Sequence, residues 1–170
     1  MADKTLTVSY DVTLSAIYKR TDKSINPADL RDYLRYIDLK DSLANGNGNG
    51  RANLLYHQRS VLNNSTEYYN LDGVLLDSYG DTLNFDSVKC LIVKNRETAE
   101  FNFLEVTFKN EHWYIGPEGS RVAWEPFGTG IAPIVSSASF EEGRIAVSSN
   151  DNITYDIIII GSESESSVSP

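Results

Sequence analysis

The side chains best suited to metal binding or nucleophilic catalysis are few in this 170-residue sequence. There are two histidines, His57 and His112, and one cysteine, Cys90. A zinc or iron site needs several nitrogen or sulfur ligands, so this set predicts no metal centre. Cys90 alternates with Val88 and Ile92, which predicts a small buried residue without the base that a nucleophile needs. We expect no catalytic residue and no cofactor, and hence a protein that is not an enzyme.

Three acids near a glycine turn are the remaining candidates for cation binding. Asp77, Asp81 and Asp86 flank Tyr79-Gly80 and offer the oxygen ligands that calcium prefers. Their spacing does not match the calcium loop of an EF-hand. Asp beside Gly is also expected in turns for backbone reasons alone, which is the favoured interpretation here.

Aromatic side chains form the one group that could mark a binding surface. Trp113, Tyr114, Trp124 and Phe127 lie on both sides of a Gly-Pro-Glu-Gly turn. Rigid, amphipathic rings suit contacts with a sugar or with a protein partner. The same residues would fill the core if they lay on adjacent strands of a sandwich, and this is the stronger interpretation.

Charge and hydropathy limit the partners. The net charge is −9, from 15 basic and 24 acidic residues, and no basic cluster is present. Affinity for nucleic acid comes mainly from Lys and Arg on phosphates, so nucleic-acid binding is not expected. The sequence contains no apolar run of about 18 residues, so no membrane-spanning helix is predicted. The first residues lack the apolar segment of a signal peptide, so we expect a protein that is kept in a reducing compartment or is exported by a route other than classical secretion.

The segment from residue 6 to 18 has a strict period of two. Since successive side chains of a strand point to opposite faces, this pattern predicts one unusually long β-strand. Such a strand either folds into the sandwich of its own chain or pairs with the sheet edge of a neighbouring chain. The residues proposed for inter-chain pairing are Leu6, Val8, Tyr10, Val12, Leu14, Ala16 and Tyr18.

A short helix is expected after this strand. Asn26 can cap it, Pro27 suits its first position, and an i, i+3, i+4, i+7 pattern begins at Leu30 and includes Tyr33 and Ile37. The helix should end between residues 40 and 43, before an Asn/Gly run. We therefore expect an N-terminal arm at 1–44, a linker at 45–50, a body at 51–161 and an acidic tail at 162–170.

The body has the pattern of an all-β domain. Short apolar segments alternate with turn residues at intervals of about 8–12 residues, which is typical of a β-sandwich or jelly roll. The unbroken run Ile157–Ile160 predicts a central strand that is buried on both faces. Strands are expected at 52–60, 65–71, 74–76, 87–94, 101–108, 112–115, 121–125, 131–135, 144–148 and 153–160.

Several segments of the body resemble a group of small structural proteins of tailed bacteriophages and prophages. The similar segments are Leu54–Ser60, Leu71–Gly73, Asp77–Gly80, Phe85, Val88–Asn95, Gly116–Gly119 and Ile153–Gly161. They cover the body and consist of strand and turn residues. Members of that group carry less before the linker, so the arm at 1–44 is where this chain departs from them.

The resemblance implies a virion component, most closely a head-decoration or cement protein on the outer surface of the head. The implied partners are the major capsid protein and further copies of this chain, commonly as a homotrimer. The alternative is a tail-associated or receptor-binding module that binds a cell-surface glycan through Trp113, Tyr114, Trp124 and Phe127.

Overall fold

The computed structural model describes residues 5–18, 33–46, 50–108, 111–124, 132–133 and 143–163. The chain divides into two compact units, Val8–Ser42 and the combination of Met1–Thr7 with Leu43–Pro170. The described residues form strands and turns and contain no helix, as expected of a mainly β protein. Accordingly, none of the described segments could cross a membrane as an apolar helix.

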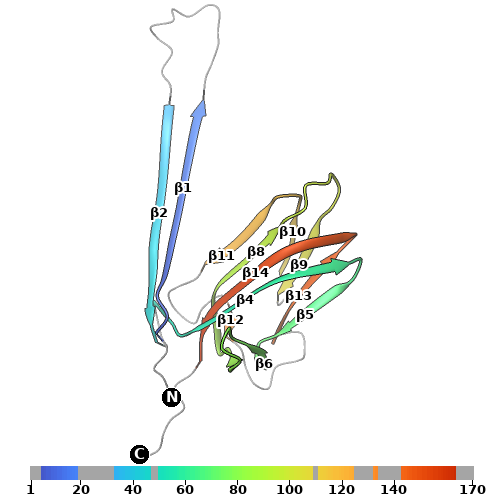
Figure 1. The fold of residues 1–170 in the computed structure, drawn as a ribbon. Helices are drawn as coiled ribbons and strands as arrows, with labels where there is room; N and C mark the ends of the chain where they lie inside the picture. Colours follow the sequence, from blue (N-terminus) through green and yellow to red (C-terminus); the bar gives the residue numbers. More distant parts are fainter. Residues whose placement is uncertain are drawn as a thin grey trace, which may run out of the picture. The chain divides into compact units, whose positions relative to one another are not determined.

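The first unit is built from two long strands, β1 (Val8–Tyr18) and β2 (Tyr33–Asn45). They are neighbours in one sheet and run in opposite directions (Figure 1). We call this pair the N-terminal hairpin. A third strand, β3 (Arg51–Ala52), pairs in parallel with only Ala44 and Asn45 at the end of β2. The strand β1 confirms the long strand that the period of two predicted.

The expected helix is wrong from Tyr33 onward, because β2 occupies those residues. Tyr33 and Ile37 are four positions apart, a spacing that satisfies both a helix face and one face of a strand. Pairing of the backbone with β1, a strand distant in the sequence, favours the strand at these residues. A helical pattern read from a few neighbouring residues does not reveal such pairing. The capping residues Asn26 and Pro27 lie outside the described residues.

Two antiparallel sheets form the second unit, as the sandwich pattern predicted (Figure 1). We call them sheet C, in the order β11-β8-β14-β4, and sheet D, in the order β10-β9-β13-β5; β12 also pairs with β8. The strands of sheet C are β4 (Leu54–Asn63), β8 (Ser87–Asn95), β11 (Ser120–Trp124), β12 (Ala132–Pro133) and β14 (Asn152–Ser162). Those of sheet D are β5 (Thr66–Asn70), β9 (Leu104–Phe108), β10 (Glu111–Ile115) and β13 (Arg144–Ser149). A small separate pair consists of β6 (Asp72–Leu76) and β7 (Thr82–Asn84).

One hydrophobic core joins the two sheets. Alternate residues of β14, among them Ile153, Tyr155 and Ile157, are fully buried together with Leu104 and Val106 of β9. The run Ile157–Ile160 lies in β14, between β8 and β4, and is largely buried on both faces. The prediction of a central, doubly buried strand is confirmed.

The pairing of β14 with β8 contains a bulge between Ile160 and Gly161. A Cβ atom at Gly161 would lie 2.1 Å from the carbonyl oxygen of Ser87 and 2.6 Å from the ring of Phe85. Both atoms are held in the buried part of the molecule, where the packing leaves no room to move. Only glycine therefore permits this close approach of the two backbones.

Each expected strand of the body has a counterpart, with shifted ends. The segment at 52–60 is divided between β3 and β4, and the segment expected from residue 101 begins at Leu104. The strand β7 was not expected. Residues 164–170 of the expected tail and 47–49 of the expected linker lie outside the described residues.

Candidate functional site

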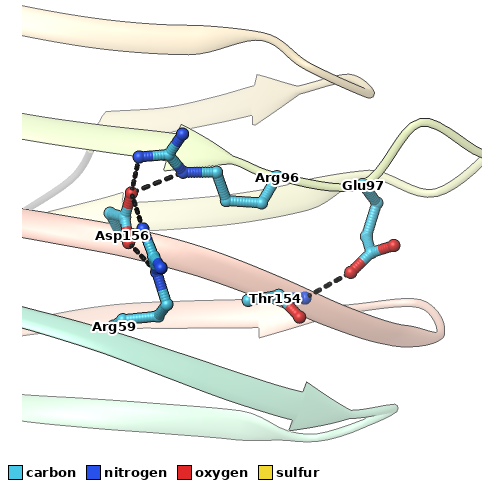
Figure 2. Close-up of polar contacts among 5 residues, drawn as sticks. All are labelled: Arg59, Arg96, Glu97, Thr154 and Asp156. Atoms are coloured by element: carbon cyan, nitrogen blue, oxygen red, sulfur yellow. Dashed lines mark hydrogen bonds and ion pairs between the residues drawn. The ribbon is translucent and has the colours of Figure 1, made fainter.

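A cluster of charged residues lies on the outer face of sheet C (Figure 2). Asp156 of β14 is only 7% exposed and accepts hydrogen bonds from two arginines. Its Oδ1 lies 2.7 Å from Nε of Arg59, and its Oδ2 lies 2.5 Å from Nε of Arg96. A further contact joins Oδ2 to Nη2 of Arg96. These bonds lower the pKa of the Asp156 carboxyl, that from Arg59 contributing most, although burial alone would raise it.

Strand register explains why these charges meet. Asp156 stands opposite Arg59 on β4 and opposite Lys94 on β8. Arg96 follows β8 directly, and its N–H donates to the carbonyl of Thr154 at 2.9 Å. The Glu97 carboxylate then accepts the N–H of Thr154 at 2.9 Å (Figure 2). The cluster therefore also fixes the end of the pairing between β8 and β14.

The chemistry available to this cluster is ionic recognition. Side chains of Arg59 and Arg96 remain 62% and 41% exposed while they bond Asp156. Guanidinium groups stay charged at all physiological pH values and do not act as proton donors or acceptors in catalysis. The cluster holds three cations, Arg59, Lys94 and Arg96, against two carboxylates, Asp156 and Glu97. Its positive excess suits binding of a carboxylate-bearing partner.

The outer face around this cluster carries apolar as well as polar side chains. Side chains alternate along each strand, so Ile158 shares the outer face with Asp156 and stands opposite His57 and Ile92. Val61 of β4 is 63% exposed and Leu55 is 41% exposed. Exposed apolar side chains beside a charged cluster give this face both kinds of group that contacts between proteins use.

A second polar network lies between the sheets, near β4 and β5. The hydroxyl oxygens of Tyr69 and Tyr155 are 2.5 Å apart, and Tyr155 donates to Oε2 of Glu67 at 2.7 Å. Ser60 donates to the same oxygen at 2.5 Å, and Gln58 to the other carboxylate oxygen at 3.4 Å. Burial is the main cause that raises the pKa of both tyrosines.

This second network has a structural role. Raised tyrosine pKa values keep both hydroxyls protonated, and every buried side-chain polar atom among the described residues has a hydrogen-bond partner. Satisfied networks of this kind stabilise one packing of the core. The network ties edge strand β4 of sheet C to edge strand β5 of sheet D.

The histidines and the cysteine singled out in the sequence are not brought together. His57 is exposed on β4, and His112 is exposed on β10, with Nδ1 at 3.1 Å from a Glu105 carboxylate oxygen. Cys90 is buried, as expected, and burial raises the pKa of its thiol to about 12. The described residues contain no group of three or more side chains arranged to hold a metal ion.

Of the three acids near Tyr79-Gly80, Asp77 forms a turn. Its Oδ1 accepts the backbone N–H groups of Tyr79 and Asp81 at 2.8 and 2.9 Å. This is the backbone role that Asp commonly plays beside Gly. Asp86 follows the end of β7 and donates its backbone N–H to the carbonyl of Ser162.

The predicted aromatic surface is divided between different environments. Trp113 is half-buried against the core, with the Arg121 guanidinium 5.2 Å from its ring centre. Tyr114 points to the opposite face of β10 and is 69% exposed. Trp124 lies on β11, in the other sheet, and its side chain is not among those described; Phe127 lies outside the described residues.

An exposed aromatic group that the sequence analysis did not single out lies beside Tyr114. Phe103 packs edge to face on Tyr114, with ring centres 6.0 Å apart, and Phe101 is 78% exposed. Phe101 has a backbone φ of 76°, a left-handed conformation that no sequence pattern predicts for phenylalanine.

The seven residues proposed for inter-chain pairing lie on or next to β1. Leu6 precedes the strand, and its N–H donates to Oδ1 of Asn45 at 2.9 Å. Leu6 and Val8 are half-buried. For the remaining five, the structure describes the strand backbone and not the side chains.

Comparisons with protein-family models, with curated proteins and with solved structures found no match to this chain.

Proposed function

We propose that this chain is a non-enzymatic structural component of a tailed-phage particle, of the capsid-decoration or cement type. In this proposal it lies on the outer surface of the head and binds the major capsid protein. The resemblance of the body segments supports this class of protein. The N-terminal hairpin supports the mode of attachment.

The observation that carries the proposal is the open edge of the N-terminal hairpin. The strand β1 is the end strand of its sheet, so within the described residues it pairs only with β2. On the other side of β2, β3 pairs with only two residues. A hairpin with so little cover is marginally stable in water, and its unpaired N–H and C=O groups are a template for another strand.

Strand addition is therefore the proposed mechanism of attachment. An edge strand of a capsid subunit would pair with β1, supplying main-chain hydrogen bonds, and alternate side chains of β1 would occupy pockets of the partner. Because the chain would bind only the assembled shell, each bound copy would shift the equilibrium towards assembly.

The first experiment measures the copy number of this chain relative to the major capsid protein in purified particles, by quantitative mass spectrometry. We expect a ratio within a few-fold of the capsid protein. A handful of copies per particle would contradict the decoration proposal and favour the tail-associated, glycan-binding alternative.

A second experiment tests the hairpin. Replacing Val8–Ser42 with a short Gly/Ser linker should reduce occupancy on particles that lack the native protein by at least about tenfold, since the pairing edge is lost. The matched control is a Tyr79→Ala variant, which alters an exposed aromatic residue in a turn of the body. Full occupancy by the hairpin-replaced chain would refute the proposed attachment.

A further inference from the structure

Phe101 is held in an unusual and costly position. It is 78% exposed and has a backbone φ of 76°, although a bulky side chain is disfavoured in this left-handed region. Strained conformations persist where the surrounding structure enforces them, and they cluster at binding sites. Phe101 thus combines an exposed aromatic ring with a disfavoured backbone conformation, and packing of the loop alone does not require either.

Side-chain hydrogen bonds enforce the conformation around Phe101. The Asn150 amide accepts the N–H of Phe103 at 2.9 Å and donates to the carbonyl of Phe101 at 2.8 Å. From the other side, Nδ2 of Asn95 donates to the carbonyl of Asn102 at 3.1 Å. The backbone that carries the Phe101 ring is therefore held in place, which reduces the entropy lost on binding.

We call Phe101, Phe103 and Tyr114 the aromatic knob. Its surroundings are acidic: Glu100 precedes Phe101, Asp151 follows the clamping Asn150, and the Glu105 carboxylate accepts a hydrogen bond from the Tyr114 hydroxyl at 3.4 Å. Two knobs facing each other would bring like charges together, which is unfavourable. The knob therefore suits a partner surface that is apolar and basic.

A surface of this composition is present on the same chain. The outer face of sheet C carries Arg59, Lys94 and Arg96 around the apolar side chains of Val61 and Ile158. We call these five residues the basic face. Asp156, which both arginines bond, and Glu97, which follows Arg96, offset part of this positive charge. In a chain with a net charge of −9, the remaining positive excess complements the acidic knob.

We propose that the aromatic knob of one copy docks on the basic face of a second copy of this chain. Phe101 is the anchor, the apolar side chains of the face receive its ring, and the arginines meet the acids that surround it. The contact joins two different surfaces, so a pair of copies can make it twice around a two-fold axis or repeat it around a ring. This inference does not depend on the proposed particle function.

The test uses the full chain in sedimentation-velocity experiments over a range of concentrations. We expect the wild type to self-associate and Phe101→Gly to weaken association at least about tenfold. Glycine suits the left-handed φ, so Phe101→Gly should fold and melt no lower than the wild type. Val61→Glu, an exposed change that adds an acid to the basic face, should weaken association equally. Tyr79→Ala is the control and should leave it unchanged.

Mixing the two defective variants tests the pairing itself. Each variant keeps one of the two surfaces intact, so a mixture of Phe101→Gly and Val61→Glu should associate more strongly than either variant alone. Two outcomes overturn the proposal: a wild type that stays monomeric up to about 1 mM, or association that Phe101→Gly leaves unchanged. A mixture that associates no more strongly than either variant alone also overturns it, because a mixed pair should keep one intact contact between the knob and the basic face.

Discussion

Asp156 shows at the scale of one residue how register creates a charge cluster. Its two arginine partners come from neighbours on both sides of β14, at sequence separations of 97 and 60 residues. Removal of the carboxylate charge would leave two guanidinium groups without their common acceptor. The resulting loss of stability is moderated because both arginine side chains remain in contact with solvent.

The cluster predicts a pH dependence of stability. The pKa of Asp156 is lowered from its ordinary value of 3.8, so its contribution is present above that pH and is lost as the pH falls through the lowered value. At pH 7, Asp156→Asn should lower Tm by about 2–6 °C. The difference from the wild type should shrink below about pH 4. Thermal melts of both proteins between pH 7 and pH 3 provide the measurement.

A constant difference in Tm down to pH 3 would show that Asp156 acts through packing and not through its charge. Glu105→Gln is a suitable control, because Glu105 lies in sheet D and bonds His112 and Tyr114. Its melting curve should not reproduce the acid-dependent difference seen for Asp156→Asn.

At the scale of elements, β1 is the strand whose outer edge matters most. The N–H groups of successive residues in a strand point to opposite edges. Proline removes an N–H and is tolerated only where that N–H faces an open edge. Thr13 and Leu14 are adjacent, so the N–H of one faces β2 and the N–H of the other faces the open edge. Proline at the first of these positions should break the hairpin. Proline at the second should only remove a hydrogen bond available to a partner strand.

We expect the variant that keeps the hairpin to lose attachment to particles. Hairpin integrity is checked by NMR amide resonances of β1 and β2, and attachment by the occupancy assay described above. Thr13→Ala and Leu14→Ala control for the side chains lost in the two proline variants. If the hairpin-preserving proline variant attaches as well as the wild type, the open edge of β1 is not the attachment site.

The elements also show where sequence reasoning succeeded. Strands of the body were predictable because their limits depend on local turn residues, such as Gly116–Gly119 between β10 and β11 and Asn150-Asp151 between β13 and β14. The turn expected at Asp72-Gly73 is wrong, because both residues lie in β6. The strand β2 was not predictable, because Tyr33 and Ile37 fit two periodicities and pairing with β1 decides between them. The left-handed Phe101 depends on the side chains of Asn150 and Asn95, which the sequence does not place nearby.

At the scale of the whole molecule, the two compact units differ in what stabilises them. The body has a continuous core, whereas the described residues of the unit Val8–Ser42 belong to two strands, β1 and β2. Amides of β14 and β8 should therefore exchange with solvent only through global unfolding, and amides of β1 should exchange through local opening. Hydrogen exchange measured by mass spectrometry distinguishes the two, with at least about a hundredfold difference in rate expected. Equal protection of β1 and β14 would contradict the independence of the units.

The sequence contains one cysteine, and Cys90 is buried with its thiol pKa raised to about 12. Thiol-directed reagents attack the thiolate, so the native chain is nearly inert to maleimides at neutral pH. A cysteine introduced at the exposed Tyr79 would then be the single reactive position on the folded protein. The molecule is thus ready for single-site attachment of a fluorophore or spin label without removal of a native thiol.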